Sequence, residues 1–157
     1  MARAFLSHSS ADKARYVRTV AEKLRPISAE YDEWTFEEGM QPLEEIVRGL
    51  DSSQVFVVFL SNDALNSHWV KRELALAHNA LAEHALQRIY PIIIDPTITY
   101  NDPRLPQWLK DGYNLKYVSR PVIAARRIKQ RLREVAWSQH PGLMARDVIF
   151  VGRNELS

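Results

Sequence analysis

The sequence predicts an α/β domain with a doubly wound sheet of five parallel strands and helices on both faces. The unbroken apolar run Val55–Leu60 is typical of a parallel strand that is buried on both sides. Other short apolar runs alternate with segments whose apolar residues recur at helical spacing, which favours right-handed strand–helix–strand connections. With 157 residues, 46% hydrophobic and 25% charged, the chain can form one domain with a full core.

The first half of the chain contains two predicted strand–helix units. Ala4 to Leu6 form a strand, and Ser9 or Ser10 can cap the helix that follows. The apolar positions of that helix are Tyr16, Val17, Val20, Ala21 and Leu24. Residues 30–34 are the second strand, residues 35–41 a loop, and Pro42 fits the first turn of the next helix. That helix has an apolar stripe of Leu43, Ile46, Val47 and Leu50.

The second half continues the pattern after Val55–Leu60. The next helix has its core stripe at Val70, Leu74, Ala77 and Leu81. Residues 89–94 are the fourth strand, although Pro91 is unusual in a central strand. A short helix over 107–110, a weak fifth strand over 115–118 and a helix over 122–135 complete the predicted domain.

Trp69 and Glu73 are the most informative pair of residues. They are four residues apart at the start of a predicted helix, so they lie on one helix face about one turn apart. The preceding strand places them near the carboxyl ends of the sheet, where ligands bind in open α/β folds. A stacking surface beside one acidic group suits the cleavage of a bond to a ribose.

Composition argues against several other functions. The absence of cysteine excludes disulfides and thiol chemistry, and the five histidines show no metal-binding spacing, so we expect no metal and no resident cofactor. The net charge of +2 does not call for nucleic acid or a membrane. The basic residues of the last helix are expected to form a solvated face: Arg126, Arg127, Lys129, Arg131 and Arg133. We expect a soluble, cytoplasmic domain, because neither a signal peptide nor a membrane span is visible.

Four motifs in matching order make the chain resemble TIR domains, especially bacterial ones that cleave NAD+. They are Phe5-Leu6-Ser7-His8-Ser9-Ser10-Ala11-Asp12-Lys13, Asp32-x-Trp34 with Gly39, Ser67-x-Trp69-Val70-x-x-Glu73-Leu74, and Tyr90-Pro91-Ile92-Ile93-Ile94. The resemblance implies a flavodoxin-like sheet and covers most of the predicted TIR domain, residues 1–137.

The resemblance also implies roles for particular residues. Glu73 would be the catalytic carboxylate that acts on the nicotinamide–ribose bond of NAD+, the substrate. The substrate-binding residues would be Ser7, His8, Ser9, Asp32, Trp34 and Trp69. In the family, clustering activates the enzyme through the loop after the second strand. The assembly residues here would be Phe36, Glu37, Gly39 and Met40.

The C-terminal end of the sequence differs from the rest. Residues 138–146 are predicted to be a linker, because they contain Pro141 and Gly142. Residues 147–157 are similar to the opening of STAND-type (NACHT-like) P-loop NTPase domains, through Phe150-Val151-Gly152-Arg153-x-Glu155-Leu156. This resemblance implies that the chain is the N-terminal effector domain of a TIR–STAND defence protein against phage.

Three other interpretations compete with an NAD+ glycohydrolase. A non-catalytic TIR scaffold that acts by homotypic assembly is disfavoured by Glu73, which adaptor-type domains often lack. A two-component receiver is excluded, because Ser7-His8 and Ser61 stand where its acidic residues belong. A deoxyribosyltransferase-like enzyme is a more distant possibility. The product stays open between ADP-ribose, a cyclic isomer and a base-exchange product.

Overall fold

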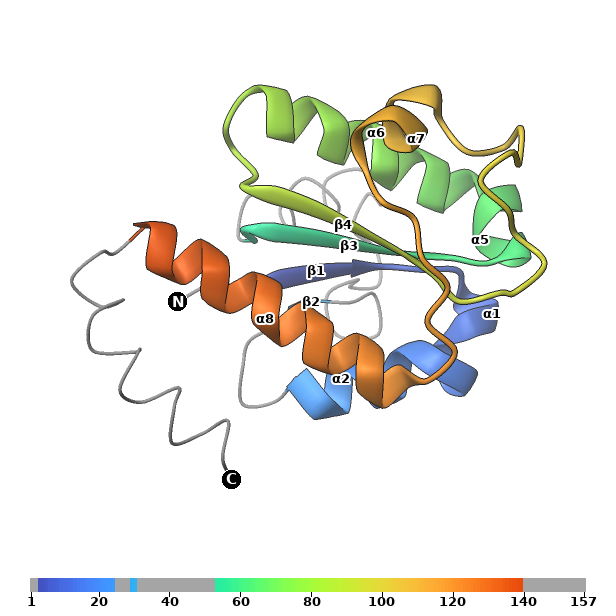
Figure 1. The fold of residues 1–157 in the computed structure, drawn as a ribbon, viewed down its shortest axis with the longest axis horizontal. Helices are drawn as coiled ribbons and strands as arrows, with labels where there is room; N and C mark the ends of the chain where they lie inside the picture. Colours follow the sequence, from blue (N-terminus) through green and yellow to red (C-terminus); the bar gives the residue numbers. More distant parts are fainter. Residues whose placement is uncertain (1–2, 25–28, 31–52, 140–157) are drawn as a thin grey trace, which may run out of the picture.

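A parallel sheet lies at the centre of the computed structural model, which describes residues 3–24, 29–30 and 53–139. Within those residues the sheet has four strands in the order β2-β1-β3-β4 (Figure 1). Their bounds are Ala4–Ser7 for β1, Ala29–Glu30 for β2, Val55–Leu60 for β3 and Arg88–Ile93 for β4. The predicted second strand over 30–34 thus begins one residue early, and its remainder lies outside the described residues.

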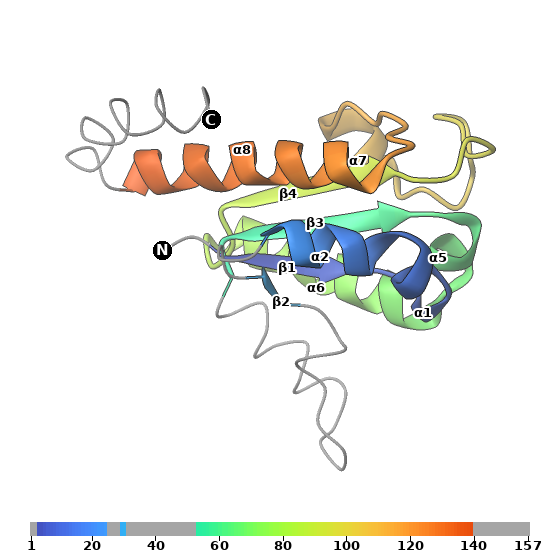
Figure 2. The same ribbon diagram turned by 90° about the horizontal axis from the view of Figure 1, so that it is seen from below.

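Helices cover both faces of this sheet, as Figure 2 shows from below. One face carries α1 (Ser10–Asp12), a π-helical turn η1 (Lys13–Val17), α2 (Arg18–Leu24) and α8 (Pro121–Gln139). The other face carries α5 (Asn62–Asn66), α6 (His68–Ala82) and α7 (Gln107–Gly112). No helix in the described ranges has the length and apolar character that a membrane crossing needs.

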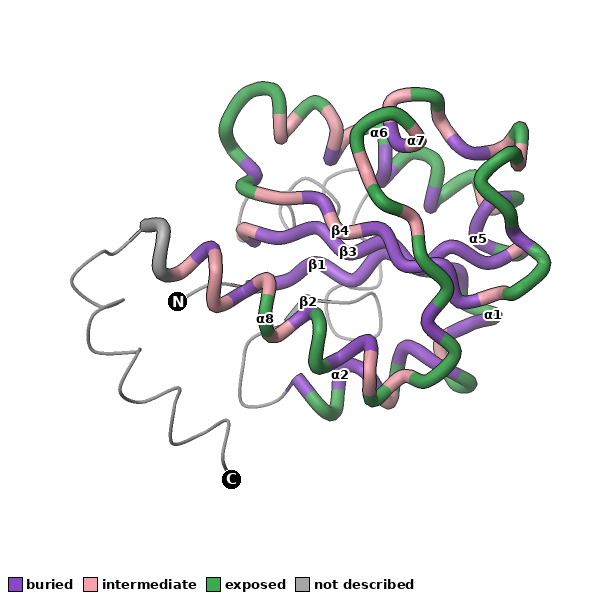
Figure 3. Tube along the Cα trace, viewed as in Figure 1, coloured by how far each residue is buried: buried purple, intermediate pink, exposed green. Residues whose placement is uncertain are grey.

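Strand β3 is buried along its whole length, as its unbroken apolar sequence predicts (Figure 3). Its side chains alternate between two apolar layers. Val55, Val57 and Phe59 pack with the α2 and α8 side of the core, whereas Phe56, Val58 and Leu60 pack with the α5, α6 and α7 side. Strand β3 therefore contributes side chains to both apolar layers.

The predicted fifth strand over 115–118 is wrong as a strand. It forms only an isolated parallel bridge between Tyr117 and Ile93, held by two backbone hydrogen bonds: Ile93 N–H donates to Lys116 O (3.0 Å) and Val118 N–H to Ile93 O (2.8 Å). A buried side-chain bond adds to it, since Tyr16 Oη donates to Val118 O at 2.7 Å. Burial raises the pKa of Tyr16 far above its ordinary value, so the phenol keeps the proton that it donates.

Pro91 explains why the segment separates from β4. The N–H of Ile94 donates to Leu60 O in β3, whereas the N–H of Ile93 points the other way, to Lys116 O. Because donors alternate along a parallel strand, the nitrogen of Pro91 also points away from β3. The proline therefore costs β4 no bond to β3, but it removes a donor on the side where a fifth strand would pair.

The segment after β3 contains a helix that the sequence prediction missed. Ser61 caps α5 by accepting from Ala64 N–H (2.9 Å), and the backbone leaves the helix at Ser67. Ser67 then caps α6 by accepting from Val70 N–H at 3.3 Å. Trp69 and Glu73 are thus at the start of a helix as predicted, but of the second helix after β3.

Candidate active site

Two of the predicted site residues, Ser7 and Glu73, meet where the direction of the sheet order changes. The chain adds β2 on one side of β1 and β3 on the other, so the carboxyl ends of β1 and β3 flank the topological switch point. Ser7 ends β1 and Ser61 follows β3, and both are buried there. A crevice of this type is where open α/β sheets bind their ligands.

Glu73 reaches this point from α6. It lies on the buried side of the helix with Val70, Leu74 and Ala77, and the whole residue is only 5% exposed. Ser7 Oγ donates a buried hydrogen bond to Glu73 Oε1 at 2.7 Å. This bond helps to fix the orientation of the carboxylate, which has two oxygens and several acceptor positions.

His8 and Ser9 continue the chain beyond Ser7. His8 is buried, and its Nδ1 lies 2.9 Å from Leu6 O. Because a carbonyl can only accept, Nδ1 is the donor in this pair, which fixes the ring orientation. Ser9 caps α1, since its Oγ accepts from Ala11 N–H at 3.2 Å. The prediction that Ser9 or Ser10 caps this helix is confirmed for Ser9.

A buried bond between Asp12 and Ser61 was missed by the sequence analysis. Asp12 is completely buried, accepts from Ser61 Oγ, and also accepts from Arg15 Nε at 3.0 Å. The bond joins the end of α1 to the residue that follows β3 and caps α5. A usable signal was present, because both residues follow buried strands that end at the same edge of the sheet.

Trp69 lies on the surface rather than in the core. It is 45% exposed, and the guanidinium carbon of Arg72 is 5.5 Å from its ring centroid. Its position one turn before Glu73 puts an accessible aromatic face next to the buried carboxylate.

Several predicted residues lie outside the described ranges. They are Asp32, Trp34, Phe36, Glu37, Gly39 and Met40. The structure brings Ser7 into contact with Glu73, with His8 and Ser9 next in the chain and Trp69 one helical turn before Glu73. The functional roles of these residues, and of the positions outside the described ranges, stay predictions. Among the described residues no group of three His, Asp or Glu side chains could hold a metal ion.

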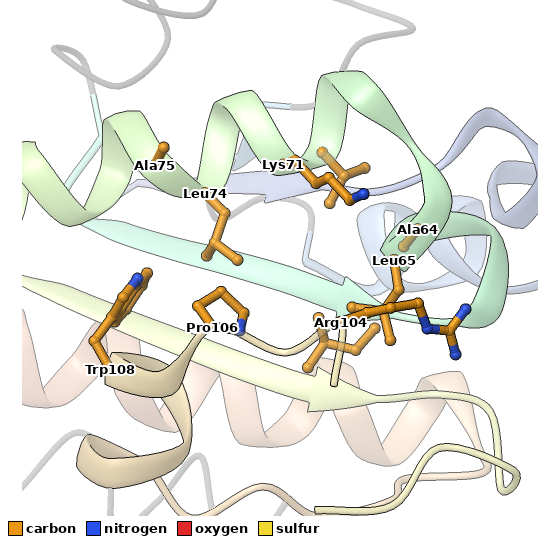
Figure 4. A pocket seen from close by; sticks show the side chains of 10 residues that line it. Ala64, Leu65, Lys71, Leu74, Ala75, Arg104, Pro106 and Trp108 are labelled. Atoms are coloured by element: carbon orange, nitrogen blue, oxygen red, sulfur yellow. The ribbon is translucent and has the colours of Figure 1, made fainter. Parts of the chain in front are cut away.

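An apolar cavity of about 100 Å³ lies on a different flank of α6, next to α7 (Figure 4). Its walls include Val70, Lys71 and Leu74 of α6, with Pro106 and Trp108 opposite, and none of the predicted site residues lines it. Pockets for drug-sized ligands measure ~300–1,000 Å³. The cavity is too small for a dinucleotide, and we do not assign the candidate site to it.

Arg104 holds the loop beside this cavity in place. Its Nη2 is 2.7 Å from Asp102 Oδ2 and donates to Asn62 Oδ1 at 2.7 Å. Hydrogen bonds from Arg104 lower the pKa of Asp102 to about 2, so the carboxylate stays charged. The network fastens the segment between β4 and α7 to α5.

Comparison with known proteins identifies the class that this fold and site define. The family model described as "TIR domain" matches residues 4–120, which is most of the chain, and the chain therefore belongs to the TIR domain family. Solved TIR structures agree with the fold. The TIR domain of the Toll-related receptor TRR-2 from Hydra magnipapillata superposes with a TM-score of 0.64 at 16% identity, covering 83% of this chain and 97% of that one. TIR domains of the activated Roq1 resistosome give 0.55 at 21%, covering 64% and 63%.

Among particular proteins, the chain is similar to two bacterial proteins that are named as enzymes. It is 38% identical over 72 residues to 2' cyclic ADP-D-ribose synthase AbTIR of Acinetobacter baumannii, covering 45% of this chain and 27% of the relative. It is 39% identical over 71 residues to NAD(+) hydrolase TirS of Staphylococcus aureus, covering 44% and 25%. The alignments thus span only about a quarter of each relative.

Proposed function

We propose that this chain cleaves the nicotinamide–ribose bond of NAD+. The observation that carries the proposal is the carboxylate of Glu73, which is buried at the switch point, oriented by Ser7, and one helical turn from the exposed ring of Trp69. Relatives named as an NAD(+) hydrolase and a cyclic ADP-ribose synthase support the same substrate.

The chemistry requires few groups. Nicotinamide is cationic while it is attached to the ribose, so it leaves as a neutral base and takes the bonding electron pair without a general acid. Departure develops oxocarbenium character on the ribose, and a carboxylate in a water-poor site stabilises that charge. Glu73 supplies this carboxylate. Water attack at the ribose then gives ADP-ribose and a proton, whereas attack by a hydroxyl of the same molecule gives a cyclic ADP-ribose and a proton.

Ser7 is a positioning residue in this scheme rather than a nucleophile. Its hydroxyl hydrogen is directed at Glu73 Oε1, and in the extended backbone that leads out of β1 the next side chain, His8, points to the opposite face. The two residues therefore do not form a serine–base pair of the acyl-transfer type.

Trp69 provides the stacking surface in the proposal. We expect Trp69→Ala to raise the KM for NAD+ by roughly 5- to 30-fold, because stacking of an aromatic ring on a cation or base contributes ~1–2 kcal/mol. Unfolding free energy should change by less than ~0.5 kcal/mol, since the residue is 45% exposed. Trp69→Phe, which retains a ring, should restore most of the affinity. A KM unchanged in Trp69→Ala would remove this residue from the substrate surface.

The proposal has three further parts. Self-association activates the enzyme, an NTPase module follows the linker over residues 138–146, and the consumption of NAD+ serves defence against phage. Support comes from the family resemblance and from the Roq1 neighbour, which is described as an activated resistosome. The competing candidate is a TIR scaffold that assembles without catalysis, and the same resistosome neighbour is the observation that favours it.

The deciding experiment measures NAD+ loss and identifies the product, with dilute protein and with protein clustered on an artificial scaffold. Turnover that requires clustering would support the enzyme and its activation together. Clustered Glu73→Ala should assemble normally and consume no NAD+. A wild-type protein that clusters and leaves NAD+ intact would establish the scaffold interpretation instead.

A further inference from the structure

A second cavity, of about 250 Å³, lies on the other side of the sheet from α6. It is lined by Tyr90, Pro91 and Ile92 of β4, by residues of the 114–118 segment, and by α8. Ile92 and Val118 belong to the apolar layer shared with α8, whereas Glu73 lies on α6, on the opposite layer. The cavity is therefore separate from the candidate active site.

The cavity has a structural cause. Residues 114–118 contact β4 by backbone bonds only at Ile93, and Pro91 offers no donor on that side. The segment consequently leaves the sheet edge instead of pairing along it. Side chains from the segment and from α8 then surround the space beside Pro91.

Positive charge gathers around this space. Lys116, Arg127 and Arg131 line it, and no acidic residue does. Arg127 and Arg131 are one turn apart on α8, and the guanidinium carbon of Arg131 is 5.0 Å from the ring centroid of Tyr90. Three cations that converge on one concavity repel one another, which favours an anion between them.

Most of this charge is not neutralised by the protein. Arg131 has Glu134 Oε1 at 3.8 Å, but that carboxylate also pairs with Arg88. Within the residues that the structure describes, neither Lys116 nor Arg127 takes part in an ion pair. About two positive charges are therefore left for a ligand, which matches a phosphate dianion.

We propose that this cavity, bounded by Lys116, Arg127, Arg131 and Asn114, binds the phosphate or diphosphate group of a small molecule. Guanidinium groups pair with phosphate oxygens through two parallel bonds, a lysine adds a point charge, and an asparagine amide adds a neutral donor. The volume fits a diphosphate group rather than a whole dinucleotide. A concave site with three cations also differs from the extended basic surface that a nucleic-acid backbone needs.

The test uses inorganic pyrophosphate as the probe, with NaCl matched for ionic strength and no NAD+ present. Calorimetric titration and the thermal midpoint should both show binding to the wild type, since a ligand of the folded state raises its stability. The double variant Lys116→Ala/Arg127→Ala should bind at least tenfold more weakly. Arg126→Ala is the matched control, because Arg126 is an exposed neighbour that does not line the cavity, and it should bind as the wild type does.

Three results would overturn the proposal. One is that pyrophosphate raises the thermal midpoint of the wild type no more than NaCl of the same ionic strength does. Another is that the double variant, or Lys116→Gln/Arg127→Gln if the alanine variant is unstable, binds like the wild type. The third is that a duplex oligonucleotide binds more tightly than pyrophosphate and depends equally on Arg126, which would indicate a nucleic-acid surface. None of these measurements depends on NAD+ cleavage.

Discussion

Replacing Glu73 by glutamine is expected to lower the rate of NAD+ cleavage by at least ~100-fold while the fold is retained. Glutamine has nearly the same volume, and its amide oxygen can still accept the hydrogen bond that Ser7 Oγ donates to Oε1. What the variant lacks is the negative charge that, in the proposed reaction, faces the developing oxocarbenium ion. The measurement is NAD+ loss by clustered protein, with circular dichroism and the thermal midpoint recorded for both proteins.

Two further variants make this result specific. Glu83→Gln removes the charge of an exposed glutamate at the end of α6 and should leave the rate unchanged. Glu73→Asp keeps the charge on a shorter side chain and should retain part of the activity, because the carboxylate is present but misplaced. A Glu73→Gln protein that is folded, clustered and as active as the wild type would contradict the proposed role of Glu73.

The second large effect concerns stability. Asp12→Ala is expected to lower the free energy of unfolding by about 2 kcal/mol, because the buried hydroxyl of Ser61 loses its acceptor. Ser61 also caps α5 through Ala64 N–H, so the disturbance reaches both α1 and the start of α5. The thermal midpoint should fall by roughly 4–8 °C for a chain of this size. Urea unfolding and calorimetry measure the two quantities.

Glu22→Ala is the matched control for this prediction. Glu22 is an exposed acid on α2, which follows α1 and η1 in the chain. Its loss should change the free energy of unfolding by less than ~0.5 kcal/mol. Asp12→Asn keeps an oxygen that can accept from Ser61 and should fall between the two. An Asp12→Ala protein as stable as Glu22→Ala would mean that the bond to Ser61 contributes nothing to the folded state.

The sequence allowed the fold class and part of the site to be predicted, because both depend on local patterns. The apolar run of β3 is long enough to identify a doubly buried strand, and the spacing of Trp69 and Glu73 fixes their helix face. The pairing of Ser7 with Glu73 joins residues 66 positions apart, so it becomes visible only when the strand order is known. The same applies to Asp12 and Ser61, which are 49 positions apart.

The errors also have physical reasons. The break between α5 and α6 depends on Ser67, whose backbone leaves the helical region, and serine is compatible with either a helix interior or a cap. The segment over 115–118 has the composition of a strand, but the neighbouring β4 carries Pro91. A parallel ladder needs backbone N–H donors from both of its strands, and Pro91 has none. Whether residues 115–118 pair as a strand therefore depends on β4 and not on their own composition.

Pro91 has a consequence for contacts between copies of the protein. Between Arg88 and Pro91, the outer side of β4 has no strand partner in the described part of the chain, and exposed edges of this kind can pair with a strand of another molecule. The proline withholds a hydrogen bond at the end of that edge, so an incoming strand cannot extend the ladder past it. Copies that meet at this edge must therefore associate through side chains, which is reversible, and not through a continuous intermolecular sheet.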